Sequence, residues 1–143
     1  MTTATDAQVR LRAPIADEAL AAINAARVRR VAVDAIARPA LTIESYRDEA
    51  YRQILIALES REPSITAADI TRPAALIESE VCLTVALLCE AASQKGASTT
   101  QQALDLFGQE ALRWRAMYDR AISAASPIDG VRGMGRSFPW SRG

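Results

Sequence analysis

Apolar residues return every three or four positions along most of the first 125 residues, which is the period of an α-helix with one buried face. The most regular stretch covers residues 100–125. Its apolar stripe consists of Leu104, Phe107, Ala111, Trp114, Tyr118, Ala121 and Ala125. A second regular stretch begins at Thr42, a residue type that caps helices, and ends before Pro63. Its stripe consists of Ile43, Tyr46, Ala50, Ile54 and Leu58. We expect an amphipathic helix in each stretch.

Two further stretches are predicted as helices from different patterns. Residues 74–93 are apolar around most of the helix circumference, so this helix is expected at the centre of a bundle or buried between subunits. Residues 16–37 have an imperfect apolar stripe, and the β-branched residues within 27–33 also suit a strand. We favour a helix there, with a break before Pro39.

The predicted fold is therefore all-α: a small helical bundle of about four helices. It has an extended N-terminal arm and a C-terminal tail rich in glycine, arginine and aromatic residues. Within the bundle, residues 64–73 form a connector in which Thr66 and Asp69 have the spacing of a capping turn. The predicted domains are the arm at residues 1–14, the bundle at 15–125 and the tail at 126–143.

The C-terminal tail differs in composition from everything before it. It contains four of the six glycines of the chain together with Pro139, and this combination prevents a helix. An exposed Phe138 and Trp140 would be a liability in a free monomer. The tail therefore either folds back over its own domain or binds a partner, and we favour the partner. The predicted partner-binding residues are Arg132, Arg136, Phe138, Trp140 and Arg142, with the aromatic rings as anchors.

Composition excludes several classes of function. The net charge is zero, so the chain lacks the general basic surface of a nucleic-acid binder. It has no His, which removes the usual general base and the commonest metal ligand. Cys82 and Cys89 are too far apart along one helix for a disulfide and are expected to be buried thiols. The longest apolar run, residues 81–89, is too short to span a membrane, and we expect a soluble protein with no signal peptide, cofactor, metal or enzymatic activity.

Three polar features could suggest a catalytic or ligand-binding site, but a structural role is favoured for each. Glu78 and Glu80 point about 200° apart on a helix, so they cannot share a substrate and are interpreted as solvated or interface charges. Residues 130–135 are rich in glycine but lack the strand and the Gly-Lys-Ser/Thr ending of a phosphate loop. The densest basic cluster of the body consists of Arg27, Arg29 and Arg30. A nucleic-acid contact is conceivable for this cluster, although a solvated or intersubunit face is favoured.

Three segments follow one another in a recognisable order: a short turn, an Ala/Leu-rich helix, and a helix with spaced aromatic and basic residues. They are Ser64-Ile-Thr-Ala-Ala-Asp-Ile-Thr-Arg-Pro73, Ala74-Ala-Leu-Ile-Glu-Ser-Glu-Val-Cys-Leu-Thr-Val-Ala-Leu-Leu-Cys-Glu-Ala91 and Leu112-Arg-Trp-Arg-Ala-Met-Tyr-Asp-Arg-Ala121. In this order the region 42–125 resembles the helical head-to-tail adaptor proteins, also called head-completion or connector proteins, of tailed bacteriophages and gene transfer agents. The N-terminal 40 residues match that family less well.

The resemblance implies a virion structural protein, made in the host cytoplasm, that assembles as a homo-oligomeric ring, typically a dodecamer. The ring would dock on the portal protein and present its other face to a stopper or tail protein, while genome DNA passes through it without sequence-specific binding. It further implies that the C-terminal segment, here residues 126–143, reaches the portal or a neighbouring subunit. The alternative hypothesis is a small helical nucleic-acid-binding or regulatory protein that uses Arg27, Arg29, Arg30 and the basic tail.

Overall fold

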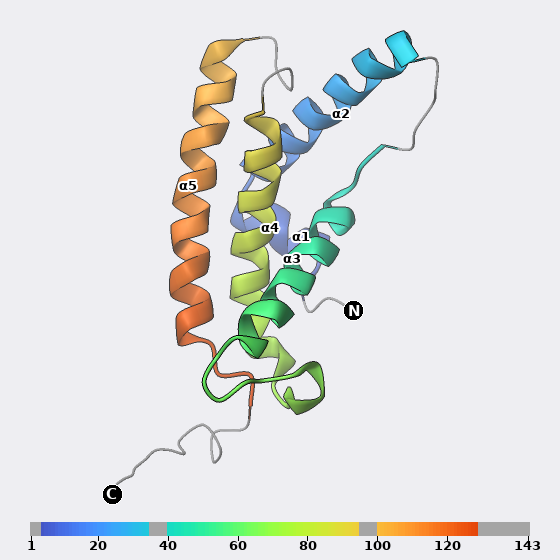
Figure 1. The fold of residues 1–143 in the computed structure, drawn as a ribbon. Helices are drawn as coiled ribbons and strands as arrows, with labels where there is room; N and C mark the ends of the chain where they lie inside the picture. Colours follow the sequence, from blue (N-terminus) through green and yellow to red (C-terminus); the bar gives the residue numbers. More distant parts are fainter. Residues whose placement is uncertain (1–3, 35–39, 95–99, 129–143) are drawn as a thin grey trace, which may run out of the picture.

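The computed structural model describes residues 4–34, 40–94 and 100–128, and within these ranges the chain is helical with no strand (Figure 1). The α-helices are α1 (Asp6–Arg12), α2 (Ile15–Asp34), α3 (Ile43–Glu59), α4 (Ile77–Ala92) and α5 (Gln101–Ala124). Two short 3-10 helices, η1 (Ala67–Asp69) and η2 (Pro73–Leu76), lie in the connection between α3 and α4. The prediction of an all-α fold is confirmed.

Helix α4 is the centre of the domain. Its buried residues are Ser79, Glu80, Val81, Cys82, Leu83, Thr84, Val85, Ala86, Leu88, Cys89 and Ala92. These residues point in every direction around the helix, so α4 needs neighbours on all sides. The neighbours are α1, α2, α3 and α5, each of which packs on α4, with α5 on one side and α2 and α3 on the other (Figure 1). The expectation that this helix is buried is confirmed, and the burial occurs within a single chain.

The amphipathic helices begin and end close to where their sequence patterns predicted. The Thr42 hydroxyl accepts a hydrogen bond from the Ser45 amide at 3.3 Å, and the Thr100 hydroxyl accepts one from the Ala103 amide at 3.2 Å. These caps satisfy amides that have no partner inside the helix. The core-facing residues of the two helices are Ile43, Ala50, Ile54 and Leu58 on α3, and Phe107, Ala111, Trp114 and Tyr118 on α5.

The prediction of an extended N-terminal arm was wrong for Asp6–Arg12, which form α1. Thr5 and Gln8 make a reciprocal capping box: the Thr5 amide donates to Gln8 Oε1 at 2.8 Å, and the Gln8 amide donates to Thr5 Oγ1 at 3.2 Å. Seven residues are too few for a stable isolated helix. Packing on α4 supplies the stability, because Val9 is fully buried. The bundle therefore contains five α-helices among the described residues instead of about four.

Helix α2 resolves the choice between helix and strand at residues 27–33, because it continues to Asp34. Residues 35–39 lie outside the described part of the chain. Asn24 links α2 to the start of α3: its side-chain amide nitrogen donates to the Leu41 carbonyl at 2.9 Å, and its side-chain oxygen accepts from the Leu41 amide at 2.9 Å. The predicted capping turn in the connector is confirmed, since the Thr66 amide donates to Asp69 Oδ2 at 2.9 Å. The predicted helix 74–93 begins as the 3-10 helix η2 and becomes an α-helix at Ile77.

None of the helices in the described ranges has the length and apolar character needed to cross a bilayer.

The central position of α4 predicts a large cost for removing side-chain volume from it. Leu88 is 0% exposed, so Leu88→Ala should lower the free energy of unfolding by about 2–5 kcal/mol through lost burial and an unfilled cavity. The matched control is Leu112→Ala on α5, where the leucine is 75% exposed, and it should change stability by less than about 0.5 kcal/mol. Urea unfolding of both variants checks the difference. Equal losses in the two variants would contradict the assignment of α4 as the core helix.

Candidate functional site

The end of α5 is fixed to the body of the protein by Arg61, which follows α3. The last carbonyls of a helix have no partner inside it. Arg61 supplies partners at this end: its guanidinium donates to the Ala125 carbonyl oxygen at 3.0 Å and also to the Ile122 carbonyl oxygen. A cation at this position is also favoured by the negative end of the helix dipole. The direction in which the chain leaves α5 is therefore set by a side chain from another part of the fold.

The chain is anchored a second time just after α5. Pro127 is buried, and its carbonyl oxygen accepts hydrogen bonds from the Thr71 amide at 3.0 Å and the Arg72 amide at 2.7 Å. Both amides belong to the connector between η1 and η2. Ile128 is half-buried and packs against the core. The packed part of the domain thus extends to Ile128, which lies beyond the predicted domain boundary at residue 126.

The five predicted partner-binding residues lie outside the described residues. They are Arg132, Arg136, Phe138, Trp140 and Arg142. What the structure does define is the base of this segment, which we call the tail root: Arg61, Pro127 and Ile128, with the amides of Thr71 and Arg72. The tail root is formed where the connector passes beneath the end of α5 (Figure 1). Sequence reasoning missed Arg61, because a carbonyl-capping arginine has no local sequence signature.

The two described arginines of the α2 cluster, Arg27 and Arg29, have different environments. Arg27 is half-buried and lies near Tyr46 of α3. Burial raises the pKa of Tyr46, and the positive charge of Arg27 partly opposes this rise. Arg29 is exposed, and the side chain of Arg30 is outside the described part of the structure. Of the two described arginines, one is therefore directed toward α3 and the other toward solvent.

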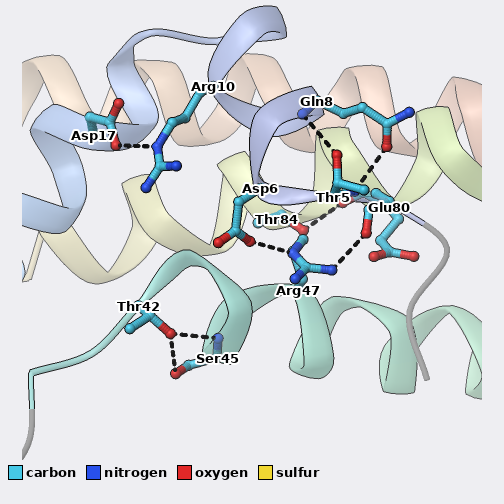
Figure 2. A network of polar contacts seen from close by, with 11 residues as sticks. Thr5, Asp6, Gln8, Arg10, Asp17, Thr42, Ser45, Arg47, Glu80 and Thr84 are labelled. Carbon is cyan, nitrogen blue, oxygen red and sulfur yellow. Dashed lines mark hydrogen bonds and ion pairs between the residues drawn. The ribbon is translucent and has the colours of Figure 1, made fainter.

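The two glutamates near the start of α4 have separate environments, which confirms that they do not share a site. Glu78 is half-exposed and pairs with Arg12 of α1, and this ion pair lowers the pKa of Glu78. Glu80 is fully buried, so the interpretation of both residues as solvated or interface charges was wrong for Glu80. It lies in the polar network between α1, α3 and α4, near Arg47 and Thr84 (Figure 2).

Arg47 is the cation of this network and joins α3 to α1. Its Nε donates to Asp6 Oδ1 at 2.7 Å, and its Nη1 donates to the Ala4 carbonyl oxygen at 2.6 Å (Figure 2). The Thr84 hydroxyl donates to the Glu80 backbone carbonyl oxygen at 2.6 Å, as is common for threonine inside a helix. The arrangement holds α1 on the bundle, and we interpret it as structural.

Further charged contacts involve α5 and its neighbours. The Arg115 guanidinium of α5 meets both carboxylate oxygens of Glu90 on α4, with N···O distances of 2.7–3.1 Å. The Trp114 ring lies under two guanidinium groups, Arg12 at 5.9 Å and Arg113 at 5.5 Å from the ring centroid. Its indole N–H donates to Glu110 Oε1 at 3.2 Å. Trp114 is buried in the core, as its position on the apolar stripe predicted.

The described residues contain no group of three or more acidic or cysteine side chains arranged to hold a metal ion. Both cysteines are buried and reduced, as expected, and burial raises the pKa of each thiol to about 12. A thiol in this state is a poor nucleophile, because the thiolate is the reactive form. Comparisons of the chain with models of protein families, with curated proteins and with solved structures gave no match.

The raised pKa values predict that neither thiol reacts while the protein is folded. At about pH 8, Cys82 and Cys89 should resist a maleimide or an aromatic disulfide reagent in native buffer, and both should react fully in denaturant. Mass spectrometry of timed samples counts the labelled thiols. Fast labelling of either thiol in native buffer would contradict the buried, protonated state.

The tail root predicts a stability cost that is specific to Arg61. Arg61→Met keeps most of the aliphatic stem but leaves the carbonyls of Ile122 and Ala125 without their donor, which should lower the free energy of unfolding by about 1–2 kcal/mol. Arg52→Met is the matched control, since Arg52 is exposed and pairs only with Glu49 within α3. It should cost less than about 0.5 kcal/mol. Similar unfolding midpoints for the two variants in urea would show that Arg61 does not fix the end of α5.

Proposed function

We propose that this protein is a structural head-to-tail adaptor of a phage-like particle. Copies of the helical domain assemble side by side as a ring. The ring docks on the portal through the C-terminal segments and connects the portal to the stopper or tail protein. The proposal starts from the order of turn, apolar helix and aromatic-basic helix in residues 64–121, which resembles this class of protein.

The observation that carries the proposal is the contrast on either side of Ile128. Before it, the chain is anchored by Arg61 and by two hydrogen bonds to the Pro127 carbonyl oxygen. After it, fifteen residues carry three arginines, one acid, a phenylalanine and a tryptophan. A short segment of this composition, attached to a fixed base, suits binding to another protein, because aromatic and arginine side chains dominate the energetics of protein interfaces.

A ring would strengthen this contact without requiring a tight individual interaction. When one segment in a ring has bound, its neighbours are held near their own sites at a high effective concentration. Several weak contacts together therefore give a stable attachment. They can form at the same time only if each segment starts from a suitable position and direction. The tail root supports such a mechanism because it sets the position from which every copy would extend its segment.

The charged groups of the described domain also support an assembly role over a catalytic one. Its buried glutamate lies in a network that holds α1, and its thiols are protonated. Three of its arginine pairs, Arg12–Glu78, Arg47–Asp6 and Arg115–Glu90, join one helix to another. The nucleic-acid alternative draws less support from the fold, since Arg27 is half-buried next to Tyr46 instead of joining Arg29 on an open surface.

Truncation after Ile128 tests the proposal without disturbing the tail root. The shortened chain should unfold within about 0.5 kcal/mol of the full chain, because Pro127 and Ile128 are retained. Its affinity for the portal protein encoded by the same genome should fall at least about ten-fold, which corresponds to about 1.4 kcal/mol. Circular dichroism checks the fold, and pull-down and surface binding assays with purified portal rings measure the affinity.

The full chain carrying Phe138→Ala and Trp140→Ala is the matched variant, and it should lose affinity for portal rings as the truncated chain does. Undiminished portal binding by the truncated chain would disprove the role of the tail. A duplex DNA fragment is the second ligand in the same assay. Strong retention on duplex at low salt that falls steeply as salt rises would favour the nucleic-acid alternative.

A further inference from the structure

Helix α1 is attached to the bundle differently from α3 and α5. Of its seven residues only Val9 is buried, whereas α3 and α5 each bury four. Leu11, the other large apolar residue of α1, is 88% exposed. Ala4 and Ala13, near the two ends of the helix, are buried but small. This apolar burial is modest against the conformational entropy lost when the segment is ordered, so polar contacts are needed to hold α1 on the bundle.

The most buried of these polar contacts comes from Arg47 of α3. Its Nε donates to Asp6 Oδ1 at 2.7 Å, and its Nη1 donates to the Ala4 carbonyl oxygen at 2.6 Å (Figure 2). The Arg47 side chain is only 11% exposed, so salt screens this charge less than it screens a surface charge. Both acceptors lie at the start of α1. Arg47 therefore acts as a catch that holds the first turn of the helix.

Exposed contacts hold the second half of α1. Arg12 pairs with Glu78 of α4, and Arg10 Nε lies 3.1 Å from Asp17 Oδ1 of α2. The four side chains are 41–56% exposed, and ion pairs with this exposure contribute little to stability and are weakened by salt. The Arg12 guanidinium also lies 5.9 Å from the centroid of the Trp114 ring. The second half of α1 is thus held mainly by contacts that solvent can reach.

Glu80 of α4 lowers the free energy needed to release α1. It is fully buried in the network at the start of α1, close to Thr5 and Arg47 (Figure 2). Removing a carboxylate and a guanidinium group from water is costly even where they lie together. Release of α1 would return Glu80 to water and recover this cost. An apolar residue at the same position would instead favour the closed arrangement.

Cys82 lies where α1 and α5 meet on α4. Its thiol donates to Glu78 Oε2 at 3.5 Å. It also lies near Arg12 of α1 and Arg120 of α5. Cys89 is seven residues further along α4, where the charged groups near its thiol belong to α4 and α5. Release of α1 should therefore uncover Cys82 on one side and leave Cys89 covered.

We propose that α1 is a releasable strap, with Arg47 as its catch, that leaves α4 while α2, α3, α4 and α5 remain packed. Its release exposes the part of α4 that carries Glu80 and Cys82. Rising ionic strength favours release, because the ion pairs that hold α1 are weakened by salt. The device is independent of the adaptor function, since every contact that carries it lies within one chain.

Hydrogen exchange of the full chain tests whether α1 opens by itself. The Val9 and Ala13 amides donate to the carbonyl oxygens of Thr5 and Val9 at 3.2 and 2.9 Å, so they are protected only while α1 is formed. Their protection should be at least about ten-fold lower than that of the Leu88 amide, and it should not change at low urea, as expected for local opening. Protection and urea dependence equal to those of Leu88 would overturn the proposal. So would a complete lack of protection, because α1 would then not be docked.

A charge at Val9 should hold the strap open. Val9→Asp should keep a cooperative urea transition of the other helices, and a maleimide should label Cys82 at least about ten-fold faster than Cys89. Leu11→Asp is the matched control: Leu11 is exposed on the same helix, so both thiols should be labelled as slowly as in the unaltered chain. Unfolding of Val9→Asp, or equal labelling of its two thiols at any rate, would overturn the proposal.

Salt and the catch are tested together by exchange of the α1 amides. Raising NaCl from about 0.05 M to about 0.5 M should speed this exchange at least about three-fold. Asp6→Asn removes the charge that Arg47 holds, so at low salt its α1 amides should exchange at least about three-fold faster and respond less to salt. Asp17→Asn, at the exposed pair with Arg10, should change the exchange less than about two-fold. Exchange that ignores salt, or equal effects of the two variants, would overturn the proposal.

Discussion

The burial of α4 is the constraint on which the rest of this structure depends. A helix that is apolar on nearly every side cannot be stable in water until each side is covered. The other helices do this by contributing one stripe each: α5 and α3 through their regular three- and four-residue patterns, α2 through small residues, and α1 through Val9. Because each outer helix uses only its inner face, its outward face remains available for contacts with other molecules. The outward faces of these helices therefore consist of polar and charged residues with isolated apolar ones.

The covering of α4 also explains the position of α1. Glu80 is fully buried on the side of α4 that faces α1 and α3, and a buried carboxylate is costly unless polar groups surround it. Arg47 is the nearby cation, and it holds Asp6 and the Ala4 carbonyl at the start of α1. The seven-residue helix is too short to be stable alone, so its formation and the enclosure of this polar network depend on each other. A second ion pair, between Arg12 and Glu78, fixes the other end of α1.

The sequence predicted those features whose cause is local. Period and capping residues located α3 and α5, and the absence of a polar face identified α4 as buried. The capping box of Thr5 and Gln8 was also a local signal, but seven residues were too few to show a period, and α1 was missed. Other features depend on distant partners and could not be read from spacing. Glu80 is buried in a network that includes residues of α1 and α3, and Arg61 reaches carbonyls more than 60 residues later.

The base of the C-terminal segment is separated from the core helix in the fold. The tail root lies beyond the end of α5, where the Pro127 carbonyl oxygen is bound by the amides of Thr71 and Arg72. The side chains that cover α4 belong to other parts of the chain, so the C-terminal segment can be removed after Ile128 without uncovering the core. This separation suits a domain that attaches to a larger ring through many copies of one short segment, because changes in the segment alter attachment and leave the fold intact.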